Sequence, residues 1–144
     1  MDIQELLKSI GFNDFISLDL ETTGLNISKD EIIEISAIHF RDGEIFDEFT
    51  TLVKPSVSIP KKVIEITGIT DSLVSDSPLI ESIFDKFLNF IDGHIIVAHN
   101  IDFDIGFIKE YATKNEKIVN IKSLCDTFRS PHLWHLDKEN KFSL

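Results

Sequence analysis

Residues 15–25 read FISLDLETTGL, and this stretch decides the fold because it combines a buried strand with two acids. Side chains alternate across a strand, so Leu18 and Leu20 point to one face while Asp19 and Glu21 point to the other. Two neighbouring carboxylates repel each other unless a cation lies between them. Oxygen ligands without cysteine suit Mg²⁺ or Mn²⁺. So short a pattern also fits two acids at a solvated strand end that have no role.

Outward from this stretch, neighbouring strands are predicted over residues 15–20, 31–40 and 44–53. Asp42-Gly43, between the last two, is a favourable tight-hairpin turn, and short connections make consecutive strands antiparallel neighbours. The core residues expected in the third strand are Ile45, Phe49 and Leu52.

The rest of the chain alternates helices with strands. Helices are predicted over residues 2–10, 61–66 and 78–91, and buried strands over 94–98 and 118–125. Ser77 is expected to cap the helix over 78–91, and Asn100 can cap another helix after the strand over 94–98. Strand–helix–strand units favour parallel pairing. The predicted fold class is α/β, with a mixed sheet of an antiparallel three-strand meander plus parallel strands, flanked by helices.

Asp104 is a second, independent acidic feature. It lies in the first turn of the helix after the strand over 94–98, and sites in such sheets form at the carboxyl ends of parallel strands. If the strand that carries Asp19 and Glu21 is central and parallel to that strand, all three acids come to one edge. Considered alone, Asp104 fits an acid that favours the helix dipole. Its neighbour Asp102 is expected to be solvated.

Composition narrows the class of protein. The chain has 144 residues, and 14 Lys+Arg against 25 Asp+Glu give a net charge of −11. This argues against a protein that coats nucleic acid through a basic surface, but not against an enzyme that holds phosphates through cations. The single cysteine, Cys125, excludes an internal disulfide and favours a cytoplasmic location. The sequence shows neither a membrane span nor a signal peptide, so no membrane partner is expected.

Together these segments resemble the DnaQ-like (DEDDh) 3′–5′ exonucleases of the ribonuclease-H-like fold. The first family motif corresponds to residues 19–24 (DLETTG) and the second to residues 99–104 (HNIDFD). Further similar segments lie at residues 31–36, 66–71 and 125–127. The resemblance covers about residues 15–144, which leaves residues 1–14 as an N-terminal helical extension.

The resemblance implies phosphodiester hydrolysis with two divalent cations, Mg²⁺ or Mn²⁺, roughly 4 Å apart. Asp19 would bridge both ions, Glu21 would orient the ion that carries the nucleophile, and Asp104 would support the second ion. Contacts to the terminal nucleotide are implied for Thr22, Thr23, Leu25 and Asn100. Turn chemistry is an equal alternative for the first three of these residues, as helix capping is for Asn100. His99, at the end of a buried strand, is expected to be structural.

The third family motif, a histidine followed five positions later by an aspartate, is not matched at its expected place. His132 and Asp137 have this spacing, but they precede Ser143-Leu144, which resembles the segment that comes before the motif. The domain over residues 15–144 is therefore expected to be incomplete at its C-terminus and to lack its C-terminal helices. General-base catalysis typically contributes about 10²–10⁴ in rate. We expect this polypeptide alone to have little or no nuclease activity.

The sequence thus predicts a metal-dependent 3′–5′ exonuclease domain that hydrolyses terminal phosphodiester bonds of DNA or RNA, as in polymerase III epsilon-type proofreading or repair. The expected partners are the 3′ end of a single strand and a polymerase or helicase, either as a subunit or as a fused domain. The alternative is a non-catalytic protein-binding module that retains the exonuclease fold. The presence of all three acids opposes that alternative, and the unmatched third motif favours it.

Overall fold

The computed structural model describes residues 5, 8, 9, 13–119 and 121. Its sheet has the strand order β3-β2-β1-β4. The strands are β1 (Asp14–Thr22), β2 (Ile32–Arg41), β3 (Glu44–Leu52) and β4 (Ile96–Val97). β2 pairs antiparallel with both β1 and β3, whereas β1 and β4 are parallel. The predicted mixed sheet, an antiparallel meander with a parallel strand beside it, is therefore confirmed.

The hairpin between β2 and β3 has the predicted two-residue turn. Arg41 pairs with Glu44, and the residues between them, Asp42 and Gly43, have φ angles of 53° and 83°. Two consecutive residues with positive φ match the right-handed twist of the flanking strands, and aspartate followed by glycine adopts this conformation readily. Local sequence is therefore sufficient to set the register of β2 against β3 at the turn.

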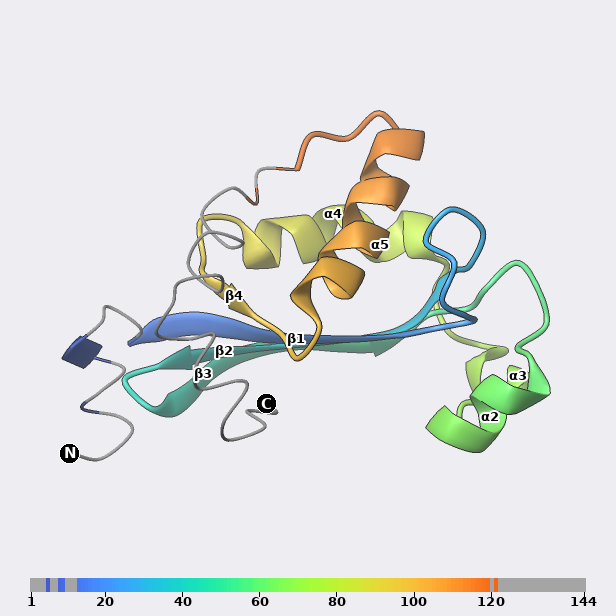
Figure 1. Ribbon diagram of the computed structural model, residues 1–144, viewed down its shortest axis with the longest axis horizontal. Coiled ribbons are helices and arrows are strands. Elements are labelled where there is room, and N and C mark those ends of the chain that lie inside the picture. Colours follow the sequence, from blue (N-terminus) through green and yellow to red (C-terminus); the bar gives the residue numbers. More distant parts are fainter. Residues whose placement is uncertain (1–4, 6–7, 10–12, 120, 122–144) are drawn as a thin grey trace.

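After the meander the chain forms the helices α2 (Lys61–Thr67), α3 (Asp71–Val74), α4 (Ile80–Ile91) and α5 (Ile101–Lys114). Figure 1 shows α4 and α5 on one face of the sheet, with α2 and α3 beside one end of it. The predicted apolar face of α4 supplies Phe84, Phe87 and Ile91 to the main core. The core side chains of β1 are Ile16, Leu18 and Leu20.

A bulge in β2 joins this core to a smaller one. Glu21 pairs with Glu34 and Thr22 with Ile32, so Ile33 is an extra residue without a partner in β1. A bulge bends its strand and redirects a side chain. Ile33 is fully buried in a separate cluster with residues that precede or belong to the two short helices: Ile59, Ile69 and Val74.

Two expectations about individual residues are wrong. Ser77 does not cap α4, because its backbone N–H closes the turn after α3 on Val74 O, and α4 begins only at Ile80 after Leu79. Ile45 is 63% exposed, because β3 is the edge strand and a bulge opposite His39 and Phe40 pairs Ile45 with Phe40, on the face that α4 and α5 do not cover.

The elements predicted near the two ends of the chain lie only partly within the described residues. Of the helix predicted over residues 2–10, Glu5, Lys8 and Ser9 are helical and the rest lies outside the described residues. Ile118, Val119 and Ile121 do not form the strand predicted within 118–125, and the remainder of that segment is not described. The expectation about C-terminal helices also falls outside the described residues.

Candidate active site

The two acids of β1 share one face of the strand, as the alternation of side chains predicts. Leu18 and Leu20 are buried against the helices, whereas Asp19 is exposed and Glu21 is half-buried on the opposite face. A rigid central strand therefore presents both carboxylates away from the core that α4 and α5 cover.

A third acid extends this face from β2. Glu34 lies directly opposite Glu21, and Ser36 lies opposite Asp19. Like charges directly opposite each other on neighbouring strands destabilise a sheet. Neither β1 nor β2 places a lysine or arginine on this face. The only basic residues of these strands, His39 and Arg41, point to the opposite face. The sheet therefore gathers negative charge here without a balancing side chain from these two strands.

Asp104 reaches the same region from α5. Its side chain is only 4% exposed, and its Oδ1 accepts a hydrogen bond from Leu20 N at 3.2 Å. Alternate N–H groups of a strand point to the same edge, and Ile16 N donates to Ile95 O across the β1–β4 edge. Because β4 ends at Val97, the Leu20 N–H of β1 lies beyond the end of β4 and donates to the Asp104 carboxylate instead of to a neighbouring strand.

Burial and like charge act together on these acids. Desolvation, followed by the negative charge of Asp19, raises the pKa of Asp104 to about 7, although the hydrogen bond from Leu20 N lowers it. Burial, and then the charges of Asp19 and Glu34, also raise the pKa of Glu21 above its ordinary value. A carboxylate that is costly to ionise without a counter-charge is well suited to hold a cation.

The donor set fits Mg²⁺ or Mn²⁺, because all the candidate ligands are hard carboxylate oxygens. The ligand atoms of Asp19, Glu21 and Asp104 do not all lie within 4.8 Å of one another. A different set of described residues does meet this distance. Mutual repulsion of uncompensated carboxylates is a sufficient physical reason for their separation.

The turn after β1 uses its hydroxyl groups internally. Thr22 Oγ1 donates to Gly24 O at 2.6 Å, and Thr23 Oγ1 donates to Asp30 Oδ1 at 3.1 Å. Thr23 Oγ1 also accepts from Glu31 N at 3.0 Å. The turn chemistry expected for the two threonines is therefore present.

Two other predicted contact residues face solvent. Leu25, at the tip of the turn, is 86% exposed. Asn100 is exposed and its side chain does not cap α5; its carbonyl oxygen accepts from the N–H groups of Phe103 and Asp104 instead. His99 is exposed rather than part of the buried strand, which corrects the structural role expected for it. Asp102 is exposed, as predicted.

Some features of the site have no local signal in the sequence. Glu34 joins the acidic face only through the pairing of β1 with β2, which the nine residues between these strands do not determine. Asp14, His39 and His94, a second group of possible metal ligands, meet only through the sheet register. The similar segment at residues 125–127, and His132 and Asp137, lie outside the described residues.

Comparison with known proteins identifies the family. Residues 16–134 match the family described as Exonuclease. This chain belongs to that exonuclease family. Members of the family generally use divalent metal ions, in agreement with the acidic site, and the sheet topology matches the ribonuclease-H-like fold predicted from the sequence.

Two similar proteins are DNA polymerase III proteins. The exonuclease domain is 45% identical to a DNA polymerase III PolC-type from Clostridium perfringens (strain 13 / Type A), over 68% of this chain and 7% of the polymerase. It is 37% identical to the DNA polymerase III subunit epsilon of Aquifex aeolicus (strain VF5), over 77% of this chain and 55% of that subunit. The chain thus spans a small part of PolC-type polymerases and about half of the epsilon subunit.

Solved structures show the same fold. E. coli exonuclease I in complex with a dT13 oligonucleotide superimposes with a TM-score of 0.64 at 18% identity, over 73% of this chain and 24% of that chain.

Among the described residues, no helix has the length and apolar character needed to cross a membrane.

Proposed function

We propose that this exonuclease domain removes nucleotides from the 3′ ends of single strands, DNA or RNA, with two divalent cations, Mg²⁺ or Mn²⁺, held by Asp19, Glu21 and Asp104. The observation that carries the proposal is the position of Asp104. It is buried, bonded to Leu20 N from 84 positions away in the sequence, and close enough to Asp19 and Glu21 for their charges to raise its pKa. No requirement of the fold explains three uncompensated acids in one place, whereas cation binding does.

Each residue has a defined part in this proposal. When bound, the cations stabilise the attacking and leaving oxygens of the phosphodiester. β1 holds Asp19 and Glu21 on a rigid strand, and the Leu20 N–H fixes the Asp104 carboxylate. Thr22 and Thr23 shape the turn next to these acids and would line the pocket with Leu25 at its tip, and Asn100, exposed before α5, would contact the terminal nucleotide from the other segment.

The relatives support a role beside a DNA polymerase, since both named ones are polymerase III proteins. We place this role, proofreading or repair, in the cytoplasm, with a polymerase or helicase as the partner. The exonuclease domain in this proposal spans residues 15–144, and residues 1–14 are an N-terminal extension.

Mn²⁺ binding to Asp104→Asn tests the site directly. Asparagine keeps the size of the side chain and an acceptor for Leu20 N, but loses the charge, so binding measured by calorimetry is expected to weaken at least about tenfold. Asp102→Asn removes the same charge from an exposed neighbour on the same helical turn and is expected to leave binding unchanged. Equal losses in the two variants would attribute the effect to net charge and would overturn the proposal.

Hydrolysis tests the direction of the reaction. A 5′-labelled single strand incubated with Mn²⁺ is expected to shorten from its 3′ end, slowly, because the third family motif is unmatched in residues 1–144. His132→Ala is expected to leave this slow rate unchanged. Loss of the activity in His132→Ala would instead identify His132 as the missing base. Robust hydrolysis that survives the substitution would show that the base is supplied elsewhere in the chain.

A further inference from the structure

A second group of metal-ligand side chains lies at the amino end of β1, away from the acidic site. Asp14 begins β1, His39 lies in β2, and His94 lies two residues before β4. Ile16 pairs with His39 on one side and with Ile96 on the other, and residues two apart in a strand share a face. The register therefore brings the three side chains together on the face that the helices cover.

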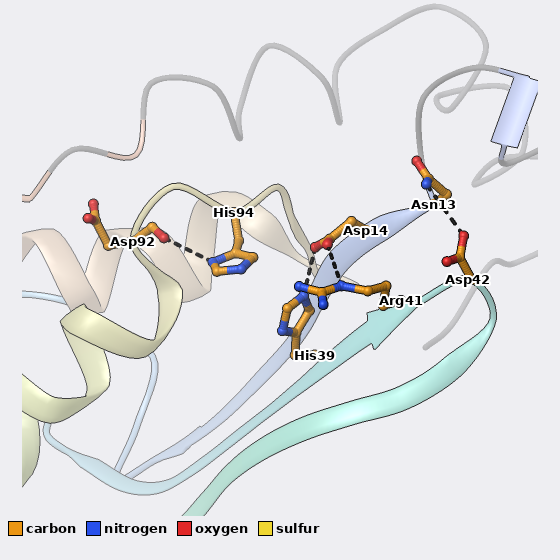
Figure 2. Close-up of polar contacts among 7 residues, drawn as sticks. All are labelled: Asn13, Asp14, His39, Arg41, Asp42, Asp92 and His94. Carbon is orange, nitrogen blue, oxygen red and sulfur yellow. Dashed lines mark hydrogen bonds and ion pairs between the residues drawn. The ribbon is translucent and has the colours of Figure 1, made fainter.

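The contacts within this cluster are close. One possible ligand atom from each of Asp14, His39 and His94 lies within 4.8 Å of the other two. His39 Nε2 is 2.7 Å from Asp14 Oδ1, and the rings of His39 and His94 meet edge-on with their centroids 4.4 Å apart. His39 is 5% exposed, and Figure 2 shows the three side chains converging from separate segments.

His94 is already oriented as a metal ligand. Its Nδ1 is 2.9 Å from Asp92 O, a carbonyl that can only accept, so Nδ1 carries the hydrogen in this bond (Figure 2). In the neutral ring Nε2 then keeps its lone pair. Histidine ligands of metals characteristically donate their other ring N–H to a carbonyl or carboxylate, which fixes the tautomer and the ring orientation.

We propose that Asp14, His39 and His94 form a second metal site, which takes Zn²⁺ or a similar imidazole-preferring transition metal. Two imidazoles and one carboxylate suit zinc and leave a fourth position for water, whereas Mg²⁺ prefers oxygen ligands. The site is separate from the acidic one. Asp19 lies five positions after Asp14 in β1, about 16 Å at strand spacing, and the two side chains point to opposite faces. This proposal does not depend on the exonuclease proposal.

Neighbouring groups set the expected strength of the site. Arg41 Nε donates to Asp14 Oδ2 at 3.1 Å, which leaves Oδ1 for a metal but adds a competing positive charge. The Arg41 guanidinium is itself held over the Phe46 ring, 3.8 Å from its centroid. Ligand atoms of a tetrahedral zinc site are about 3.3 Å apart. The 2.7 Å between His39 Nε2 and Asp14 Oδ1 must therefore lengthen slightly, so we expect moderate rather than very tight binding.

A metal here would add a direct link between three segments that backbone hydrogen bonds and side-chain contacts already hold together. β4 contributes just two residues, and its register with β1 involves Ile16 and Ser17 alone. A bond from the metal to His94 would tie the segment before β4 to both β1 and β2. Binding to the folded state alone raises stability by mass action.

The test is Zn²⁺ and Co²⁺ binding by the whole chain in excess Mg²⁺, which occupies hard-oxygen sites. We expect one bound Zn²⁺, visible bands of low-coordinate Co²⁺, and a higher Tm with Zn²⁺. His94→Ala is expected to weaken binding by more than the roughly 10–100-fold that loss of a supporting partner costs. His99→Ala removes an exposed histidine five positions away and serves as the control.

Two results would overturn the proposal. One is Zn²⁺ binding that survives His94→Ala, which would place the metal elsewhere in the chain. The other is no binding by the unaltered protein, which would leave Asp14, His39 and Arg41 as an ion-pair network only. Asp14→Asn provides a second variant that keeps an acceptor for Arg41, and it is expected to weaken Zn²⁺ binding as His94→Ala does.

Discussion

At the scale of single residues, Asp104 shows a conflict between folding and function. Its pKa rises from 3.8 to about 7 in the folded protein, mainly because burial penalises the charged form and Asp19 adds a like charge. Between these two values the folded state binds more protons than the unfolded state. The free energy of unfolding of the metal-free protein must therefore fall as pH rises through this window. The raised pKa of Glu21 acts in the same direction.

Asp104→Asn is expected to flatten this dependence. The amide oxygen can still accept from Leu20 N, but no charge has to be buried, so above pH 7 the metal-free variant should be more stable than the unaltered protein by at least about 1 kcal/mol. Urea unfolding in EDTA at several pH values measures this difference. Asp102→Asn, which changes an exposed acid, should retain the slope of the unaltered protein. A variant that is less stable at pH 8 would contradict the explanation.

At the scale of elements, the turn after β1 depends on the absence of a side chain at Gly24. A Cβ there would lie 2.4 Å from Asp30 Oδ2, and Asp30 also accepts from Thr23 Oγ1 and Asn26 N. Gly24→Ala is therefore expected to cost about 1–3 kcal/mol of stability by displacing Asp30. The cost should vanish in an Asp30→Ala background, where the clash is absent. Additive losses in the double variant would show that another contact is responsible.

Gly106 provides the matched comparison within α5. The three atoms nearest to a Cβ at this position all belong to Ile27, and the nearest, Cδ1 at 2.6 Å, is the far end of a flexible side chain. Alanine gains up to about 1 kcal/mol of helix propensity over glycine, so Gly106→Ala is expected to be close to neutral. Thermal unfolding of the two glycine variants side by side measures the contrast, and equal destabilisation would argue against it.

The same elements show which parts of the structure local sequence determines. The strands β1, β2 and β3, the Asp42-Gly43 turn and the apolar face of α4 were predictable because each follows from the periodicity or conformation of a few consecutive residues. The proximity of Asp104 to Asp19 was predictable from the order of the two family motifs along the chain. The failure of Ser77 to cap α4 was not predictable. Its backbone N–H instead bonds to Val74 O at the end of α3, a helix of only four residues.

The pairing of β1 with β2 explains why other parts of both sites were missed. Nothing in the nine residues between these strands indicates that Glu21 lies opposite Glu34 or that Ile16 lies opposite His39. Exposure of Ile45 likewise depends on the bulge in the pairing of β3 with β2, which places Ile45 opposite Phe40 on the face away from α4 and is not revealed by the alternation of residues in β3 itself. Residues that are close only through tertiary pairing require the structure.

At the scale of the whole molecule, charge and function oppose each other until cations bind. A net charge of −11 repels a phosphate backbone. Asp19, Glu21 and Asp104 concentrate that repulsion where a 3′ end would lie. Bound divalent cations reverse the local charge that the ligands set. Affinity for a single strand should therefore depend on specific cation binding more than on ionic strength.

Fluorescence anisotropy with a labelled single strand that ends in a phosphorothioate linkage, which resists hydrolysis, tests this dependence. Affinity is expected to rise at least about tenfold when Mg²⁺ replaces EDTA, and NaCl of equal ionic strength should not reproduce the gain, because added monovalent salt screens charge without reversing it at the site. Asp104→Asn should lose most of the gain and Asp102→Asn should keep it, although both remove one negative charge from the same turn of α5. Equal gains in both variants would mean that Mg²⁺ acts through general screening of the acidic surface, and the three acids would then have no special part in holding the strand.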